Sequence, residues 1–557
     1  MKKSIKSLLA MSMAVMIILA GCGQTQNTDT SGKSADGSTG GANAAVNLVN
    51  QTVNTKIGND IESAKDTMVI SIPTDPGSMD IHYATTYNYV NQYTIATLLK
   101  HQYRADGSVD YVCNDESLAT AYKLDDNDMG VTFTLREGVT FQNGYALTAA
   151  DVAFSIKRCK DLSYFNTVDF DNIKVVNDNT IYVPFKYVDA NSIYNIGIDI
   201  PIYSEKYFYE IGADKDDSEF CSTAIIGAGP YKLVEWKAND YLLFEAYDNY
   251  FAGKPKIKNL RIRIIKDPSV AFMELQNGGV DIIAINPNWT DVEAVLKGNT
   301  SGIACWEESS AYTLELGFNC SGPLSDLKLR QAIACAVDKQ ALAEGGYQGS
   351  GVNTYSLVSL TLPGTTDYKD NWPYQYDPER AKQLLADAGY KSGELTLKII
   401  VGAGDTLRTA TAEAMGAYLK EIGINLKIVS VDIATYASTI AKQPDQWDMF
   451  LRNFGSGLSI APSAHAFFKD NVTANCHIDK QDTSAKMLDL ATKMGEEMNI
   501  EKRNTVYKEL QDYYINDCLY TYPIVQAKSY MLVNQKLKNV TRVGYDTWSV
   551  AFGYFEK

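Results

Sequence analysis

Stretches in which apolar and polar residues alternate recur along the chain from residue 66 onward. A period of two residues is typical of a strand with one buried face, so each stretch predicts a β-strand. Residues 231–251 contain two such runs on either side of the polar sequence KAND, which predicts a β-hairpin. The other predicted strands cover residues 66–73, 129–141, 257–267, 394–404 and 424–431.

Segments with helical spacing of apolar residues lie between these strands. Thr148 is a suitable N-cap for one of them, and Asp151 stands at its third position. Arg330 and Lys339 are expected on the solvent side of another. The alternation of strands and helices predicts a mixed α/β sheet. The predicted helices fall within residues 149–160, 268–286, 326–342, 377–390 and 411–423, and glycines end the second, which a buried strand follows.

The N-terminal region has a different pattern. A basic heptapeptide, MKKSIKS, precedes an apolar run from Leu8 to Ala20 that is too short to span a bilayer, as in a secretory signal. The sequence from Leu19 to Cys22 resembles a bacterial lipobox, which implies a signal peptide over 1–21 and lipidation of Cys22. Residues 22–65 are mostly small and polar, so we expect them to form a flexible tether.

Composition limits the kinds of function. The folded part of about 490 residues is long enough for two or three domains. The chain has a formal net charge of −16, which argues against a nucleic-acid partner. No later segment is apolar for long enough to span a membrane.

Candidate catalytic and metal-binding patterns are scarce. The four histidines do not form HxxxH or HExxH, there is no GxSxG, and GAGPY and VGAGD each lack the rest of a phosphate loop. The nine cysteines form no CxxC pair, which favours buried free thiols, although one or two disulfides stay open. We therefore expect no enzyme, no cofactor and no metal site, while a pair of catalytic carboxylates is not ruled out by counting.

Six blocks of sequence, in order, resemble the family 5 extracellular solute-binding proteins, the peptide- and nickel-binding group of ABC importers. The resemblance covers about residues 65–557. The blocks are LREGVTFQNGYALTAADVAFSIKR (135–158), GAGPYKLVEW (227–236), DNYFAGKPKIKNLRIRII (248–265), LQNGGVDI (275–282), LGFNCSGPLSDLKLRQAIACAVDK (316–339) and YDPERAKQLLADAGY (376–390).

The resemblance implies an α/β, two-lobed periplasmic-binding-protein-like fold with mixed sheets and a subdomain inserted in lobe I. Residues 315–319 and 519–525 resemble the strands that cross between the lobes. The implied divisions are lobe I at 66–105, 225–312 and 521–557, the inserted subdomain at 106–224, and lobe II at 313–520.

Site residues follow from the resemblance one position at a time. Relatives hold a ligand in a cleft that closes between the lobes, partly through main-chain groups and partly through aromatic and charged side chains. The implied ligand-binding residues are Thr85, Tyr87, Asn288, Trp289, Tyr436, Arg452, Phe454, Ser456 and Tyr522.

One position departs from the family pattern. Relatives that take zwitterionic peptides carry an aspartate where this chain has Leu458, and no acid occurs between Asp448 and Asp470. A buried ammonium group needs a counter-charge. Either another acid replaces this aspartate, or the ligand lacks a free amino terminus, as in blocked or cyclic peptides, oligosaccharides or metal chelates.

The leading hypothesis is a lipid-anchored, monomeric binding component of an ABC importer on the outer face of the cytoplasmic membrane. It would deliver a peptide or similar solute to permease and ATPase subunits. A peptide-signal receptor or chaperone on the same fold is an alternative, and permease and ATPase genes beside this one would favour import. A secreted hydrolase is a third, which turnover of candidate peptides or glycans would support.

Overall fold

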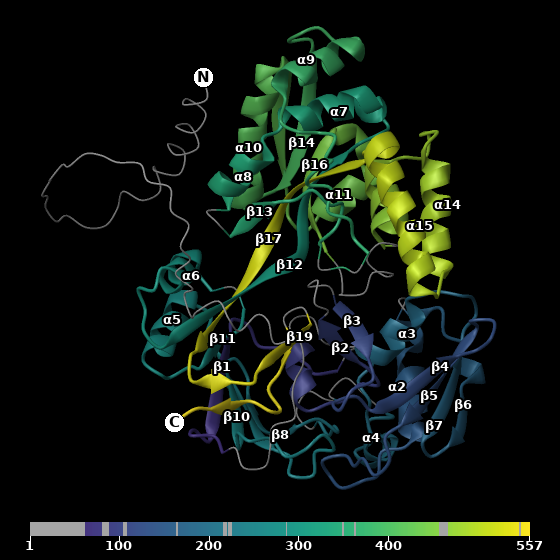
Figure 1. Cartoon of the computed structure of the whole chain (residues 1–557), viewed down its shortest axis with the longest axis vertical. Helices are drawn as coiled ribbons and strands as arrows, with labels where there is room; N and C mark the ends of the chain where they lie inside the picture. Colours follow the sequence, from purple (N-terminus) through teal and green to yellow (C-terminus); the bar gives the residue numbers. More distant parts are fainter. Residues whose placement is uncertain are drawn as a thin grey trace, which may run out of the picture.

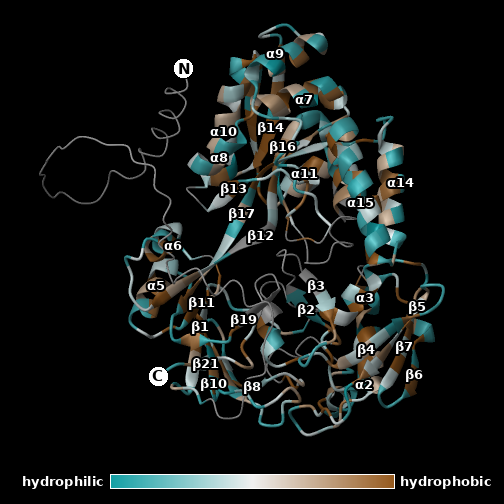
Figure 2. Cartoon of the chain, in the orientation of Figure 1, coloured by the Kyte–Doolittle hydropathy of each residue, from teal (hydrophilic) through white to brown (hydrophobic). Residues whose placement is uncertain are grey.

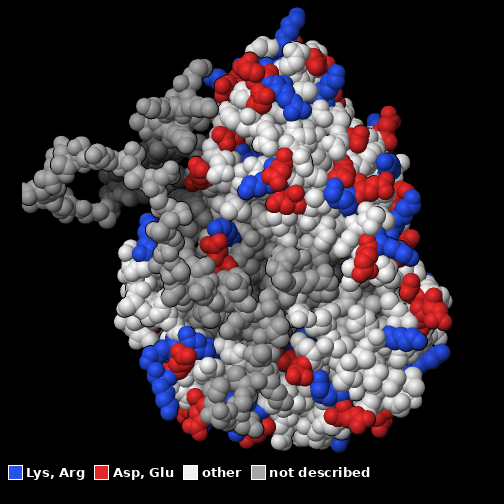
Figure 3. Space-filling model, in the orientation of Figure 1, with Lys and Arg blue, Asp and Glu red and all other residues white. Residues whose placement is uncertain are grey.

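The computed structural model describes residues 62–80, 88–103, 109–162, 165–215, 220, 225–285, 287–347, 350–360, 362, 364–455, 466–544 and 547–557. Among these residues, no helix combines the length and apolar character needed to cross a bilayer. Acidic and basic side chains alternate over the face seen in Figure 3 rather than forming a patch of one sign.

One mixed sheet runs through the whole molecule. Its two central strands are unusually long, and they connect an upper and a lower body in Figure 1. In order across the sheet, the strands are β15 (Ile424–Val431), β14 (Leu395–Gly402), β16 (Met449–Phe454), β12 (Ile303–Phe318), β17 (Thr521–Asn534), β11 (Ile282–Ile283), β1 (Thr67–Ile72), β10 (Asn259–Ile264), β9 (Tyr241–Ala246) and β8 (Tyr231–Lys237), while β13 (Gly351–Asn353) pairs with the lobe II half of β17.

The crossing strands β12 and β17 pair antiparallel, and they extend further than the sequence indicated. Residues 315–319 and 519–525 lie at or next to the upper ends of the two strands. The register shifts between Ser309 and Thr313, where the strands pass from one body to the other. An ion pair of 2.6 Å joins Glu307 to Lys528 beside this shift.

The upper body, lobe II, contains one large hydrophobic core around the ends of β12 and β17. Brown apolar strands lie between helices whose outer faces are polar in Figure 2. The helices are α7 (Leu327–Ala336), α8 (Lys339–Gly346), α9 (Pro378–Asp387), α10 (Thr406–Glu421), α11 (Tyr436–Lys442), α13 (Val472–Cys476), α14 (Ser484–Glu496) and α15 (Ile500–Tyr513), with π-helical turns η8 (Ala466–Asn471) and η9 (Tyr514–Cys518).

The lower body, lobe I, contains several cores. One lies on β1, β8, β9 and β10, and a second forms a subdomain that takes in Leu98 and Ala228 at its margins. The subdomain holds the sheet β4 (Ala119–Leu124), β5 (Gly130–Leu135), β7 (Thr180–Pro184) and β6 (Lys174–Asn177), the hairpin β2 (Lys100–Tyr103) and β3 (Val109–Val112), and helices α2 (Ala149–Arg158), α3 (Ser192–Tyr194) and α4 (Glu205–Glu210).

The remaining elements of lobe I lie at its other edge and at the C-terminus. Helices α5 and α6 pack on the lower ends of β12 and β17. Ser63, Ala64 and Lys65, at the end of the predicted tether, bond to Phe555 and Asp281 and so pack on lobe I. The elements are α5 (Pro268–Gln276), α6 (Trp289–Leu296), β18 (Leu537–Lys538), β19 (Thr541–Gly544), β20 (Thr547–Ser549) and β21 (Tyr554–Phe555).

Local sequence signals correctly placed many elements. Strands β8 and β9 form the expected hairpin, with Asn239 in the left-handed conformation at its turn. Helix α2 follows Thr148, whose backbone N–H donates to the Asp151 carboxylate at 2.9 Å. Asp377 caps α9 with its side chain, which accepts from the Arg380 N–H. These signals are reliable because the bonds they need lie within four residues.

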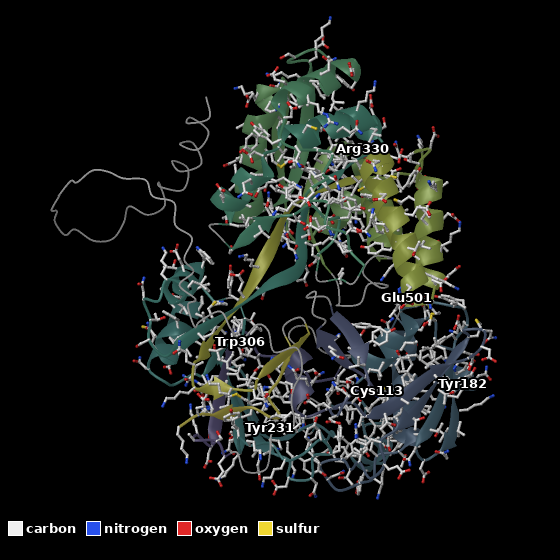
Figure 4. All side chains as sticks on the ribbon, viewed as in Figure 1. Cys113, Tyr182, Tyr231, Trp306, Arg330 and Glu501 are labelled. Atoms are coloured by element: carbon white, nitrogen blue, oxygen red, sulfur yellow. The ribbon has the colours of Figure 1, made fainter. Side chains whose placement is uncertain are left out.

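The expected solvent exposure of Arg330 and Lys339 is wrong. The predicted helix is two helices, α7 and α8, and both cations are buried in lobe II. Arg330 donates to the carbonyls of Leu324, Ser325 and Cys518, and Figure 4 places it beside α15. Lys339 donates to the Thr354 carbonyl. Backbone oxygens from distant loops solvate these charges, and helical spacing gives no sign of such partners.

The two lobes also touch away from the crossing strands. The Ala190 N–H, next to α3, donates to the Gly495 carbonyl of α14 at 2.8 Å. Met498 packs against the core of the subdomain. Figure 1 shows α14 and α15 descending toward α3. The lobes are therefore joined both by the crossing strands and by this second contact.

Candidate ligand-binding site

The lobe II ends of β12 and β16 place four side chains on one face of the sheet. Two of them, Arg452 and Phe454, were predicted as site residues, and two, Glu315 and Thr313, were not. In the antiparallel register, Glu315 lies directly opposite Arg452, and Thr313 lies opposite Phe454. Directly opposed residues share a face, and residues two apart on a strand also share it. These side chains lie close to the place where the strands pass from one lobe to the other, because Thr313 is the first paired residue of β12 on the lobe II side of the register shift.

Glu315 is the unusual member of this group. Its side chain is 0% exposed, and neither carboxylate oxygen has a hydrogen-bond partner. Burial raises the pKa of Glu315 well above its usual range, while the nearby Arg452 pulls it down. The Thr313 hydroxyl on the same face is likewise buried and without a partner. Adjacent unsatisfied groups of this kind are uncommon in folded proteins.

Arg452 is half-buried, and no hydrogen bond or ion pair to it occurs within the described part of the chain. Strand β16, which carries Arg452, is tied to α11, because the Tyr436 hydroxyl donates to the Leu451 carbonyl at 2.6 Å. Burial raises the pKa of Tyr436. Tyr436 thus supports the strand that presents Arg452.

Aromatic rings form a wall beside this group. Phe454 is 7% exposed, and its ring centroid lies 4.8 Å from that of Phe467. Phe467 and Phe468 both pack on Tyr514, with centroids 5.8 and 5.2 Å apart. Burial raises the pKa values of Tyr514 and of the Cys476 thiol, and the Glu315 charge adds to both shifts. The surroundings of Glu315 are therefore weakly polar apart from Arg452.

Tyr522 does not join this group. It lies opposite Leu316 in the register, which puts it on the other face of the sheet from Glu315. Its side chain is 0% exposed and packs on Trp372, with centroids 6.0 Å apart. The buried Lys339 lies 5.0 Å from the Tyr522 ring. Tyr522 is thus part of the lobe II core in this structure.

Asn288 and Trp289 lie in lobe I, at the start of α6. The Asn288 side-chain amide donates to the Ser269 hydroxyl at 3.0 Å. Trp289 packs on Tyr530 of β17, with ring centroids 5.4 Å apart. Figure 1 shows α6 in the lower body and β16, which carries Arg452, in the upper body. The ligand role of Asn288 and Trp289 stays a prediction.

The other predicted positions lie outside the described residues. These are Cys22, Thr85, Tyr87 and Ser456. Phe454 and Arg452 are thus the two predicted side chains that the structure brings together, with Tyr436 behind them.

The described residues hold no cluster of three or more histidine, cysteine, aspartate or glutamate side chains suited to a metal ion. His101 contacts the Tyr194 hydroxyl at 3.1 Å, and His477 contacts the Ile440 carbonyl at 3.0 Å. Within the described part of the chain, seven cysteines are free thiols and all of these but Cys113 are buried, as the spacing favoured. Burial raises the pKa of Cys159 and of Cys518 to about 12, so these thiols are poor nucleophiles.

Comparison with known proteins decides the family. Residues 116–475 match the profile of the bacterial extracellular solute-binding proteins, family 5. The chain belongs to this family. Two curated relatives are each 29% identical to it over 63% of this chain and 67% of their own length. They are the heme-binding protein A of Haemophilus influenzae and the oligopeptide-binding protein AppA of Bacillus subtilis.

Solved structures share the fold of this solute-binding protein. HbpA2 from Haemophilus parasuis has a TM-score of 0.76 at 20% identity, over 88% of this chain and 100% of that one. The substrate-binding protein CtaP from Listeria monocytogenes has a TM-score of 0.74 at 21% identity, with the same coverage. AppA from Bacillus subtilis, in complex with a nonapeptide, has a TM-score of 0.65 at 20% identity, over 89% and 100%. The α/β periplasmic-binding-protein fold is confirmed.

Membership of family 5 makes the chain an extracellular or periplasmic solute-binding protein, the substrate-binding component of an ABC importer. Such proteins bind their ligands without altering them, so the expectation that the chain is no enzyme is confirmed. The relatives differ in what their names say they bind, which leaves the ligand open between peptide, heme and metal complex.

Sequence reasoning missed Glu315 and Thr313. Both alternate with leucines in TLELGF, and alternation normally puts the polar members toward water. Only the pairing of β12 with β16, together with the cover from η8, α13 and η9, shows that this polar side is buried. The one available signal was a charged residue inside a segment assigned to a crossing strand.

Proposed function

We propose that this solute-binding protein is lipid-anchored through Cys22 and captures a peptide or peptide-like solute between its lobes for delivery to a membrane permease. The observation that carries the peptide assignment is Arg452, a half-buried cation on β16 without a partner in the described part of the chain, with the hydrogen-bonding group Glu315 opposite it. A guanidinium group suits carboxylate and carbonyl oxygens, which every peptide supplies. The name of the relative AppA also supports a peptide.

Closure of the two lobes explains how such a ligand is held. A solute enclosed between them loses contact with water, which strengthens its hydrogen bonds and ion pairs to the protein. The two crossing strands and the ion pair between Glu307 and Lys528 provide a narrow connection about which the lobes turn. The closed form presents a surface different from the empty form, which a permease can distinguish.

Native mass spectrometry of the purified mature protein tests the ligand class. We expect added mass from co-purified peptides, visible as a series of species that acid denaturation releases. Release of heme or of a metal complex instead would overturn the peptide assignment and leave the importer role intact. Loss of bound peptide in Arg452→Gln, with unchanged thermal unfolding, would tie the ligand to this residue.

Membrane fractionation of cells expressing Cys22→Ser tests the anchor. The wild-type protein should sediment with membranes, because acyl chains contribute about 0.8 kcal/mol per buried CH₂. The variant should appear in the soluble extracytoplasmic fraction or retain an uncleaved leader. Equal membrane association of processed wild type and processed variant would contradict lipidation.

A further inference from the structure

The second contact between the lobes joins a helix end of lobe II to the subdomain of lobe I. The Ala190 N–H, just before α3, donates to the Gly495 carbonyl in the last turn of α14 at 2.8 Å. Carbonyls in the last turn of a helix lack a partner within the helix, so α14 offers this acceptor to a neighbouring element. Both residues are buried, and buried backbone groups need a partner. Each lobe thus supplies the hydrogen-bond partner that the other needs.

An apolar contact accompanies this hydrogen bond. Met498, in the turn between α14 and α15, is half-buried and packs against the hydrophobic core of the subdomain. Among the described residues that form this core or pack against it, Met498 alone comes from lobe II. The part of its side chain that the subdomain covers is removed from water only while the lobes are together. Its burial therefore favours that arrangement.

Hydrogen bonds within lobe II fix the turn that carries Met498. The Glu497 carboxylate accepts from the Asn499 N–H at 2.9 Å, and the Asn499 side chain accepts from the Lys502 N–H at 3.0 Å. Neither bond involves the subdomain, so the turn keeps its shape whether or not it touches lobe I. The contact is therefore formed or broken as a unit when the lobes move.

We propose that residues 495–498 and the segment before α3 form a latch that holds the lobes together, and that receiving this latch is a function of the inserted subdomain. The crossing strands join the lobes in every arrangement, whereas this contact exists only while the lobes are together. Rotation about the crossing strands would move the lower end of α14 away from α3 (Figure 1). The inference rests on the proposed movement of the lobes and applies to any class of ligand.

The latch has a defined effect on binding. The apparent affinity of a ligand that binds the closed arrangement falls with the fraction of empty protein that is closed. The latch raises this fraction before any ligand arrives, because its hydrogen bond and its apolar contact need no ligand. It also slows ligand release, since the lobes separate only after the contact breaks. Contacts outside the candidate binding site thereby contribute to affinity.

Hydrogen exchange of the peptide that contains Ala190, followed by mass spectrometry, measures how often the latch opens. A bonded amide exchanges only while its bond is broken. The purified mature protein is first unfolded in guanidinium chloride, freed of co-purified ligand by dialysis and refolded. Met498→Ala should accelerate exchange of the Ala190 N–H about five- to thirtyfold, because it removes the apolar contact that favours the closed arrangement. Met273→Ala, the same change at a methionine on α5 that is 54% exposed, is the matched control and should leave the exchange unchanged.

Small-angle X-ray scattering of the same empty proteins shows whether the whole lobes move. Met498→Asp places a charge against the apolar surface of the subdomain, which opposes the contact more strongly than removal of the side chain. This variant should have a larger radius of gyration than wild type, whereas Met273→Asp should match wild type. Circular dichroism checks that each variant is folded.

Two results would overturn the latch. One is exchange at Ala190 that neither Met498 variant accelerates, or that is already as fast in wild type as in an unstructured peptide. The other is faster exchange in Met498→Asp with an unchanged radius of gyration, which would mean that the turn detaches while the lobes stay together. Both measurements are made without ligand. A failure to find co-purified peptide would therefore count against the proposed function and leave the latch standing.

Discussion

Two buried carboxylates, one in each lobe, differ in whether they have a hydrogen-bond partner. In lobe I, Asp80 is 0% exposed and accepts from the Arg158 guanidinium at 2.8 Å. That guanidinium lies over the rings of Tyr203, Phe208 and Phe220, at 4.9 to 5.6 Å from their centroids. In lobe II, Glu315 is equally buried and faces Arg452, but the two groups do not bond.

The difference separates a paired buried charge from an unpaired one. Asp80 and Arg158 bond to one another inside the protein, so they hold the segment after β1 against helix α2 of the subdomain. Neither oxygen of the Glu315 carboxylate has a hydrogen-bond partner. Removing one member of a bonded buried pair leaves the other charge without compensation, whereas a buried carboxylate without a partner already lowers the stability of the folded state.

The largest expected effect is on the lobe I pair. Asp80→Asn should lower the free energy of unfolding by about 3–5 kcal/mol, because it leaves Arg158 buried without its counter-charge. Urea denaturation monitored by circular dichroism measures this. A loss of unfolding free energy below about 1 kcal/mol would mean that the aromatic rings alone compensate the charge of Arg158. The difference drawn between the bonded pair in lobe I and the unbonded pair in lobe II would then be wrong.

A smaller effect is expected in the pH dependence set by Glu315. Its pKa is raised in the folded state from the usual value of 4.5, so the native protein keeps a proton that the unfolded chain has lost. The contribution of Glu315 to the free energy of unfolding is therefore greatest below about pH 4. It decreases as the pH rises toward the pKa of Glu315 in the folded state, by up to about 1.4 kcal/mol per pH unit. Arg452 on β16, Cys476 on α13 and Tyr514 on η9 lie near Glu315, and burial raises the pKa values of Cys476 and Tyr514 further above this range.

Glu315→Gln should remove this contribution. Melting temperatures of wild type and variant, measured without ligand from pH 4 to 8, should diverge, with the variant becoming relatively more stable as pH rises. Parallel curves would show that Glu315 is satisfied in the empty protein. Glu501→Gln, the same chemical change at an exposed position at the lower end of α15 (Figure 4), serves as the control.

The smallest effect concerns a third carboxylate, on the same strand as Glu315 but in contact with water. Glu307 pairs with Lys528 at the crossing point, where the side chains are 37% and 24% exposed. Glu307→Gln should cost less than about 1 kcal/mol, because partly exposed ion pairs contribute little. A loss as large as that of Asp80→Asn, in the same urea assay, would assign the crossing strands a much larger role in stability than their exposure indicates.

Sequence reasoning succeeded where the deciding contacts are local. The hairpin at 231–246 and the start of α2 depend on turn and capping residues a few positions apart. It failed for Arg330 and Lys339, whose polar partners come from segments up to 188 residues away. A helical pattern shows which residues share a face, but it does not show what the polar face will meet.

The candidate site shows the same limit. Resemblance indicated Arg452 and Phe454, and the structure puts them side by side with two groups that no pattern indicated. Tyr522, assigned by the same reasoning, lies on the opposite face because a one-residue difference on a strand reverses the side chain. The register of a strand is set by its pairing with strands that are distant in the chain. Resemblance at a single position therefore does not decide on which face of the sheet a side chain lies.

By itself, the sequence determined the elements marked by local turn and capping residues, the family resemblance, the leader-like pattern at the N-terminus and the scarcity of familiar catalytic patterns, because these depend on neighbouring residues or on ordered blocks. Only the tertiary structure decided which charges are buried and which of them are paired. Strands β12 and β16 are more than a hundred residues apart in the chain, and their register alone places Glu315 against Arg452. The free energy of a buried charge depends on its partners in space, and chain order does not specify them.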